Sequence, residues 1–302
     1  MTKHDSGKSP DPKSVTMGFV AATIVVIFWS GFNIVSRMGG RSVLTPYDLA
    51  ALRFGISAVI LLPFLFATRF VATPLQLATL ALFGGLGYAL LVYAGFSLAP
   101  AAHAGVLVNG GIPFATAIIA WLAMGYRPGA RAVVALVIAG LGIGVISYRS
   151  LIQVQPDEGR QWLGDLFFLG AATCSAIFSL LLRKWNVRPL EAMIGLAFYS
   201  SLVYFPVYLL FLPKALMLAA PSVLLLQGFY QGVIAATLAG LLYAYANLTI
   251  GPMKASLMLA LVPAASALAA GPLLGEHIGI VTWLGVALVT GGAVLGATNP
   301  KK

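Results

Sequence analysis

Charged residues are scarce in this sequence. Only 9% of its 302 residues are Asp, Glu, Lys or Arg, and 60% are hydrophobic, whereas a soluble domain carries about 25% charged residues. No soluble fold of this length can bury so much apolar surface, so the composition predicts a protein that lies in a lipid bilayer. The net charge of +10 does not indicate nucleic acid as a partner, because the basic residues stand singly or in small groups between apolar segments.

Cysteine and acidic residues are also rare. The single cysteine, Cys174, lies in an apolar segment, which excludes a disulfide within the chain and metal or iron–sulfur sites built from cysteines. None of the eight acidic residues lies in the middle of an apolar segment. The sequence has no Walker A, HExxH or GxSxG motif, so it does not indicate nucleotide hydrolysis, a metalloprotease or a serine hydrolase. We predict no enzymatic activity, no cofactor and no metal.

Long apolar segments are what the sequence has in abundance. We identify ten of about 20 residues, the length that an α-helix needs to cross roughly 30 Å of hydrocarbon. They span Met17–Arg37, Tyr47–Thr68, Pro74–Leu98, Ala101–Met124, Ala130–Tyr148, Trp162–Lys184, Glu191–Leu212, Ser222–Asn247, Met253–Leu274 and Gly279–Thr298. The sequence therefore predicts an all-α integral membrane protein with ten transmembrane helices.

The ten segments divide into two units of five. The longest connection, residues 149–161, separates a first unit at 17–148 from a second at 162–298. Residues 1–16 are polar and rich in Lys, Asp, Ser and Pro, which predicts a disordered cytoplasmic tail. Residues 299–302 are expected to form a short tail on the same side of the membrane.

Spaced prolines, acidic residues and glycines indicate that the second unit repeats the first. At an offset of 143 residues, Pro46, Asp48 and Pro63 recur as Pro189, Glu191 and Pro206. Pro113 recurs as Pro263 at an offset of 150, and we align Gly140 and Gly144 with Gly292 and Gly296 at 152. Chance matching of glycines and prolines is the alternative explanation.

An odd number of helices in each unit determines the topology. The second unit must then have the opposite orientation to the first, which is the inverted repeat common in secondary transporters. With the N-terminus in the cytoplasm, 12 of the 18 Lys and Arg residues fall in cytoplasmic segments and five in outer ones. This bias predicts that both termini are cytoplasmic.

Two matching stretches are predicted to form the walls of a substrate pathway. Gly87–Phe114 and Gly240–Ala264 each contain tyrosines, a turn with a proline, and a second apolar helix interrupted by a proline. Pro113 and Pro263 cannot donate to the carbonyl four residues earlier, and a free carbonyl at membrane depth is tolerated only in contact with protein or water. We interpret both prolines as hinges or cavity-facing kinks. A packing kink without function is the alternative.

Polar and aromatic side chains within the apolar segments are the candidate substrate contacts. Asn33 would be costly against lipid, so the helix face that it shares with Trp29 is expected to point inward. Tyrosines can stack on a substrate and donate one hydrogen bond, although an interfacial aromatic belt is an alternative. His103 could bind a carboxylate, carry a proton or only cap a turn. The complete predicted set is Trp29, Asn33, Tyr88, Tyr93, His103, Asn109, Ser179, Tyr243 and Asn247.

Other unusual residues have a structural interpretation. Gly140/Gly144 and Gly292/Gly296 have the GxxxG spacing, which predicts close helix packing within or between protomers. Arg53 lies about two turns inside its segment and could snorkel or bind carbonyls, so we expect a structural role. The middle of the pathway is then nearly neutral, which favours neutral or zwitterionic solutes over cations or phosphates.

Three segments resemble a known family. FWSGFNIVSR (Phe28–Arg37), LAALRFGISAVILLPF (Leu49–Phe64) and PAASALAAGPLLGEHI (Pro263–Ile278) resemble the first, second and ninth helices of EamA-type proteins in the drug/metabolite transporter (DMT) superfamily. The first unit departs from this pattern, since Tyr126 stands where the repeat would place the counterpart of Glu276. The amino-acid exporters of the YddG type resemble the chain most in length and aromatic content.

The resemblance implies a ten-helix carrier with two inverted repeats around a central cavity, in the plasma membrane (the bacterial inner membrane). The predicted function is export of small neutral metabolites, first of all amino acids including aromatic ones, by alternating access. A drug or lipophile exporter is one alternative. A membrane enzyme or a non-transporting subunit is an alternative of another class. The expected partners are the substrate and the lipid bilayer, and the protein would be a monomer or homodimer.

Overall fold

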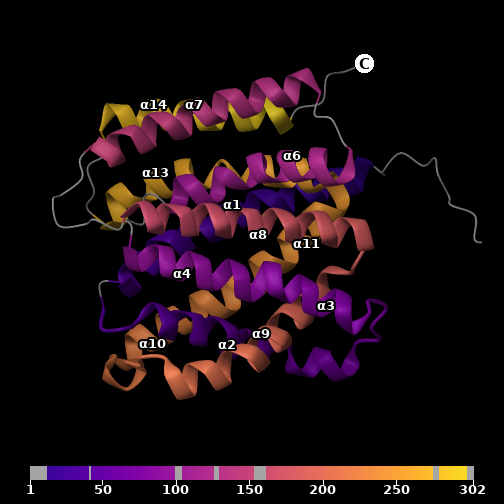
Figure 1. Ribbon diagram of the computed structural model, residues 1–302, viewed down its shortest axis with the longest axis vertical. Helices are drawn as coiled ribbons and strands as arrows, with labels where there is room; N and C mark the ends of the chain where they lie inside the picture. Colours follow the sequence, from indigo (N-terminus) through magenta and orange to yellow (C-terminus); the bar gives the residue numbers. More distant parts are fainter. Residues whose placement is uncertain are drawn as a thin grey trace, which may run out of the picture.

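The computed structural model describes residues 12–40, 42–98, 104–125, 129–152, 161–274 and 279–297. Within these ranges the regular elements are helices, and no strand is present (Figure 1). The first unit contains α1 (Pro12–Gly40), α2 (Pro46–Ala67), α3 (Pro74–Leu80), η1 (Ala81–Gly87), α4 (Tyr88–Leu98), η2 (Gly105–Asn109), α6 (Gly111–Met124) and α7 (Ala130–Ile152). The second contains α8 (Gln161–Trp185), α9 (Pro189–Phe211), η3 (Leu216–Leu218), α10 (Pro221–Gly228), η4 (Phe229–Leu238), α11 (Ala239–Ile250), α12 (Pro252–Leu259), α13 (Val262–Leu274) and α14 (Ile280–Ala297).

Among the described residues, the predicted apolar segments coincide with single helices or with consecutive helical elements. In the described part of the chain, seven helical spans are long and apolar enough to cross a membrane. Shorter apolar stretches cover Ala130–Val145 in α7 and Trp283–Gly292 in α14, and the ninth segment is divided between α12 and α13. The predicted all-helical membrane fold is confirmed. The first helix begins at Pro12, inside the stretch that was expected to be a tail.

Prolines and glycines determine where several helices begin and end. Proline supplies a helix-compatible φ and lacks an N–H that the first turn could not satisfy. It stands at the start of α2, α3, α9, α10 and α12. Gly125, with φ of 66°, ends α6, and Gly251, with φ of 88°, separates α11 from α12. A side chain at either glycine would strain this left-handed backbone.

The packing of the helices shows the same arrangement twice. The first helix of the first unit, α1, packs against α11 and α13 of the second unit. The first helix of the second unit, α8, packs against α4 and α6 of the first unit (Figure 1). Because α1 corresponds to α8, α4 to α11, and α6 to α12–α13 in the repeat, the two units exchange equivalent contacts. Each unit therefore depends on the other for its packing.

The α7–α14 pair shows that the repeat is inverted. A Cβ on Gly142 would lie 2.7 Å from the carbonyl oxygen of Gly285, and one on Gly292 would lie 2.7 Å from that of Ala135. Higher residue numbers in α7 thus meet lower numbers in α14, so the two equivalent helices run antiparallel. Gly142 corresponds to Gly292, and Ala135 to Gly285, at an offset of 150. The offset of 152 that we assigned to these helices is wrong.

This register also corrects the glycine prediction. Gly292 packs closely on α7 as expected, but its counterpart in the contact is Gly142, which the GxxxG pattern did not indicate. A Cβ on Gly140 would meet the ring of Phe114, and one on Gly144 would meet nothing within 4 Å. Gly296 lies in the last turns of α14. Gly144 therefore does not mediate packing within the chain.

Candidate functional site

Two small cavities adjoin between the two units. The first, of about 40 Å³, is here called the central cavity, and its neighbour measures about 30 Å³. Both are lined by residues of α2, η1, α9 and η4, and α1, α4, α8 and α11 complete the central cavity. The residues that line both are Arg53, Gly84, Met193, Leu196 and Ala236. The two spaces therefore meet beside Arg53.

Three of the predicted pathway residues line the central cavity: Trp29, Tyr88 and Tyr243. The rings of Trp29 and Tyr243 lie 5.1 Å apart between centroids and are tilted by 55°. The indole N–H of Trp29 donates to the carbonyl oxygen of Ala235 at 3.2 Å. Ring contacts at this distance are favourable, and a hydrogen bond fixes the polar end of the indole. The wall that these two side chains form is therefore well defined.

Ser179 supports this wall from behind. It is fully buried, and its hydroxyl donates to the Ser175 carbonyl at 2.9 Å and shares a hydrogen bond with the Tyr243 hydroxyl at 3.1 Å. Ser175 rather than Ser179 lines the cavity. The predicted serine therefore orients a wall residue, and the one a turn before it forms part of the wall.

Two π-helical stretches form part of the cavity wall. η1 contributes Gly84, and η4 contributes Ala235 and Ala236. The two stretches interrupt equivalent helices of the repeat, and π-helical turns often occur at functional sites because they displace the backbone hydrogen-bond pattern. In η4 the Thr237 hydroxyl donates to the carbonyl oxygen of Gly232 at 2.7 Å. No motif in the sequence indicated these stretches.

Arg53 is the only charged residue among those that line either cavity. Its guanidinium carbon lies 5.8 Å from the ring centroid of Phe32 and 5.9 Å from that of Tyr88. In the part of the chain that the structure describes, no carboxylate pairs with it. Arg53, for which we expected a structural role, therefore lies in the wall of both cavities and places a cation in the site.

Asn33 and Tyr93 lie outside the central cavity. Asn33 donates from Nδ2 to the Ser266 hydroxyl of α13 at 3.1 Å. Tyr93 is buried and donates to Gln231 Oε1 at 2.9 Å. Gln231 in turn donates to the hydroxyl of Ser36 at 2.9 Å. Asn33 therefore links α1 to α13, and Tyr93 links α4 to η4. Both hydrogen bonds join the first unit to the second.

Asn247 lies away from Asn33 along the helix axis. Gly18 of α1 lies against Thr249 of α11, and Gly31 lies against Tyr230 of η4. The helix α1 therefore runs antiparallel to the helical segment formed by η4 and α11. Asn247, which follows Tyr243 by one turn, therefore lies on the opposite side of the Trp29–Tyr243 contact from Asn33. Its Nδ2 donates to the Tyr243 carbonyl at 2.8 Å, and its Oδ1 is buried without a hydrogen-bond partner in the described structure.

The remaining predicted residues lie at or beyond helix breaks. Asn109 is buried at the end of the π-helical η2, immediately before α6. Pro113 is in the first turn of α6, and Pro263 is in the first turn of α13, after a break at residues 260–261. Both prolines are thus at interruptions of their helices. His103 lies outside the described residues.

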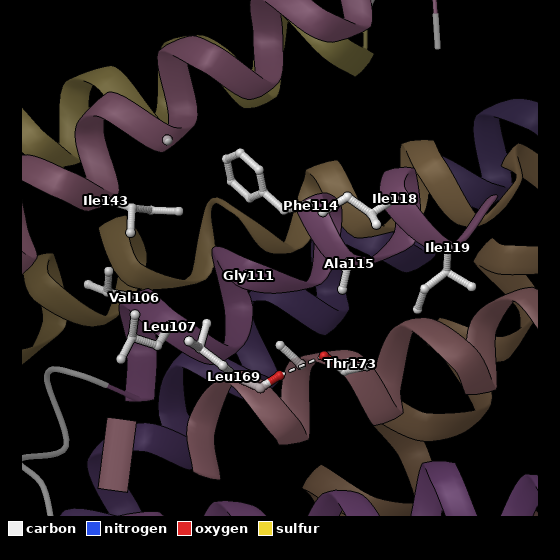
Figure 2. A pocket seen from close by; sticks show the side chains of 12 residues that line it. Val106, Leu107, Gly111, Phe114, Ala115, Ile118, Ile119, Ile143, Leu169 and Thr173 are labelled. Atoms are coloured by element: carbon white, nitrogen blue, oxygen red, sulfur yellow. Dashed lines mark hydrogen bonds between the residues drawn. The ribbon is translucent and has the colours of Figure 1, made fainter. Parts of the chain in front are cut away.

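A larger cavity lies apart from the central cavity, next to the helix break before Pro113 (Figure 2). It has a volume of about 360 Å³ and lies between α6, α7 and α8, with Phe114, Ile143 and Leu169 pointing into it. Its lining is almost entirely apolar, and Ile118 and Leu169 are 52% and 44% exposed. This cavity therefore opens on the outer face of the bundle. Sequence patterns did not indicate it, because its residues are ordinary for a membrane helix.

Among the described residues, no group of three or more His, Cys, Asp or Glu side chains is close enough to hold a metal ion. The buried carboxylates in this part of the chain are Asp48 and Glu191. Both lie at helix starts and accept hydrogen bonds from backbone N–H groups. The central cavity combines aromatic surface with one cation, which suits binding of a small amphipathic molecule.

Comparison with known proteins identifies the family. The model of the EamA-like transporter family matches the chain twice, at residues 16–148 and 162–298. One crystal structure of a protein has a TM-score of 0.70 with this chain at 19% sequence identity, and the match covers 94% of this chain and 96% of the other. At this identity the likeness shows a shared fold. No curated protein matches the sequence significantly. The two matches together span almost the whole of both predicted units, so the chain belongs to the EamA-like transporter family.

Proposed function

We propose that this protein is a secondary carrier that exports small neutral or zwitterionic metabolites, first of all amino acids including aromatic ones. The observation that carries the proposal is the central cavity, which both units build together from Trp29, Tyr88 and Tyr243 around Arg53. Aromatic faces suit an apolar side chain, and polar groups among them suit a charged headgroup. The match to a transporter family favours this function over a membrane enzyme or a non-transporting subunit.

Alternating access is the proposed mechanism. Ligand pockets usually have volumes of about 300–1,000 Å³, whereas the central cavity and its neighbour measure about 40 and 30 Å³. A substrate can therefore enter only after the two units move apart on one side. The helix breaks beside Pro113 and Pro263 and the π-helical stretches η1 and η4 are where the backbone can bend at least cost. Inverted repeats allow the same movement on the opposite side.

The cellular setting follows the sequence predictions. We propose a multi-pass protein of the bacterial inner membrane, with both termini in the cytoplasm, as a monomer or homodimer. The distribution of Lys and Arg supports this orientation. We propose an amino-acid exporter of the YddG type as a functional analogue.

A drug or lipophile exporter is the second candidate. The apolar cavity between α6, α7 and α8 favours it, because about 360 Å³ is enough for a drug-sized molecule and the opening faces lipid. The residues that line this cavity include no charged side chain, and Phe114 is the one aromatic residue among them. Substrates of this kind would bind without needing a charged headgroup.

Counterflow in liposomes that contain only the purified protein tests the proposed function. Vesicles loaded with unlabelled phenylalanine, leucine or threonine should accumulate the labelled amino acid. The Tyr88→Ala variant should transport more slowly at equal abundance, because Tyr88 lines the central cavity. Asn109→Ala is expected to act in the same direction. Absence of counterflow with correctly inserted protein, together with transport of a lipophilic dye, would favour the second candidate.

A further inference from the structure

We propose that Arg53 binds the carboxylate of the substrate, so that the carrier recognises organic carboxylates and does not require an ammonium group. This inference rests on the proposed function, because it assigns a substrate class to the same central site. It begins from the position of Arg53. The residue lies seven positions after Pro46, the first residue of α2, which corresponds to roughly 10 Å of helix.

The electrostatic environment of Arg53 is incomplete. A cation at such a depth is normally paired with a carboxylate or with backbone carbonyls. Here the guanidinium hydrogen-bonds the neutral hydroxyl of Tyr93 and lies near the rings of Phe32 and Tyr88, at 5.8 and 5.9 Å from their centroids. Aromatic rings attract a cation, but more weakly than a carboxylate does. The acidic residues of the described chain do not pair with it, so the site has capacity for one anionic group.

The nearest acidic residue in the same helix is already occupied. Asp48, five positions before Arg53, accepts hydrogen bonds from Thr45, Tyr208 and the backbone N–H of Ala215. Its carboxylate therefore holds the start of α2 to the end of α9. Glu191 is likewise bound to the backbone N–H groups of Val71 and Ala72. Neither is free to neutralise Arg53.

The cavities place space next to the guanidinium. Arg53 lines both the central cavity and its neighbour, and each has room for water. A planar guanidinium binds a carboxylate through two parallel hydrogen bonds. The rings of Trp29, Tyr88 and Tyr243 form the other walls of the central cavity and would contact the rest of the molecule. None of the acidic residues that the structure describes lines either cavity, so an ammonium group would gain little from them.

Competition with three related compounds tests this assignment in the unmodified protein. Phenylalanine has both charged groups, 3-phenylpropionate lacks the ammonium, and phenethylamine lacks the carboxylate. We expect unlabelled phenylalanine and 3-phenylpropionate to inhibit phenylalanine counterflow at similar concentrations. Phenethylamine should need at least about tenfold more. Equal inhibition by phenethylamine would overturn the assignment and leave the carrier function intact.

Variants of Arg53 provide the second test. Arg53→Gln should raise KM for phenylalanine at least about tenfold, and Arg53→Lys should recover part of this loss because it keeps the charge but not the paired donors. Arg183→Gln, at an exposed position near the end of α8, is the matched control and should leave KM unchanged. An unchanged KM in correctly folded Arg53→Gln protein would contradict the proposal.

If no counterflow is found, a binding measurement tests the carboxylate site at Arg53 separately from the proposed amino-acid transport. Ligands that bind the folded protein raise its melting temperature. A rise with 3-phenylpropionate but not phenethylamine, lost in Arg53→Gln, would support the carboxylate site even if amino-acid transport fails. No thermal shift with any of the carboxylates would overturn it. The melting temperatures without ligand show whether each variant is folded.

Discussion

Asp48 and Glu191 occupy equivalent positions at the starts of α2 and α9, and each binds the loop that follows the other helix. The Asp48 carboxylate accepts from the N–H of Ala215, after α9, at 3.1 Å. The Glu191 carboxylate accepts from the N–H of Ala72, after α2, at 2.9 Å. The two helices must therefore run antiparallel. The repeat thus places one buried carboxylate near each end of this helix pair.

The two carboxylates are not equally satisfied. Asp48 also accepts from the backbone N–H and hydroxyl of Thr45, each at 2.8 Å, and from the Tyr208 hydroxyl. Glu191 binds its loop through Oε2 alone. Its Oε1 is buried without a hydrogen bond and lies 3.5 Å from Nε of the exposed Arg188. Because the Arg188 side of this pair is exposed to solvent, its charge is screened and the pair contributes less than a hydrogen bond would.

This difference predicts unequal effects of amide substitution. Asp48→Asn should destabilise the protein by about 1–3 kcal/mol. One buried carboxylate oxygen is replaced by an NH₂ group, which would then face N–H and O–H groups that donate to Asp48. Glu191→Gln should cost less, since one amide oxygen can still accept both loop N–H groups. Thermal unfolding in detergent would measure both variants. Equal melting temperatures for the two would show that the hydrogen-bond count does not determine their contribution.

Close packing of α7 on α14 predicts a second contrast between neighbouring glycines. Gly142→Ala should lower the melting temperature markedly, because the new methyl would lie 2.7 Å from the backbone oxygen of Gly285, and backbone cannot move aside cheaply. Gly144→Ala is the matched control on the same helix. With no group within 4 Å, it should be neutral or stabilising by up to about 1 kcal/mol. A similar loss in both variants would argue against this register.

The wall of the central cavity provides the third prediction. Trp29→Phe keeps an aromatic ring beside Tyr243 but removes the N–H that donates to the carbonyl of Ala235. Loss of one such bond corresponds to about 1 kcal/mol, so transport should slow by roughly fivefold. Trp162→Phe, at the exposed start of α8, serves as control. Counterflow rates at matched protein content would decide, and identical rates for both variants would exclude a role for the indole N–H.

The fold could be predicted well from the sequence because the length of each apolar segment and the prolines and acidic residues at helix starts are local features of the chain. The ten segments and the pairing of Asp48 with Glu191 could be read directly. The register of α7 on α14 could not be read from the sequence. Close packing requires glycine on the helix face that contacts the partner helix, and the GxxxG spacing alone favoured Gly144 over Gly142. Of the nine candidate pathway residues, the amides Asn33, Asn109 and Asn247 are buried, yet burial alone does not distinguish a cavity wall from a contact between helices.

Arg53 and the π-helical stretches show where sequence reasoning stops. A single arginine near the end of a membrane helix has several possible partners, and only the three-dimensional arrangement shows that no carboxylate of the described residues reaches it. The π-helical turns of η1 and η4 are made of Gly, Ala and apolar residues that also form ordinary α-helices. Their altered hydrogen bonding depends on packing against the opposite unit, which no local pattern encodes.

The break between α12 and α13 predicts a conformational role for Pro263. Proline at this position cannot donate to the carbonyl of Leu259. Just before it, the N–H groups of Ala260 and Leu261 donate to carbonyls only three residues earlier, those of Leu257 and Met258. Pro263→Ala restores a donor, so the helix should become more continuous and the melting temperature should rise. If this break is the hinge for alternating access, exchange of substrate should slow while its affinity remains unchanged.

Pro272→Ala is the control for that experiment, because Pro272 lies within α13, exposed and away from the break. It removes a proline from the same helix without closing the gap at residues 260–261. A rise in stability with slower exchange in Pro263→Ala alone would connect the break to transport. Faster or unchanged exchange in that variant would mean that the proline only shapes the packing of α13 on α1. The bending must then occur elsewhere, and the π-helical stretches that line the central cavity would be the remaining place for it.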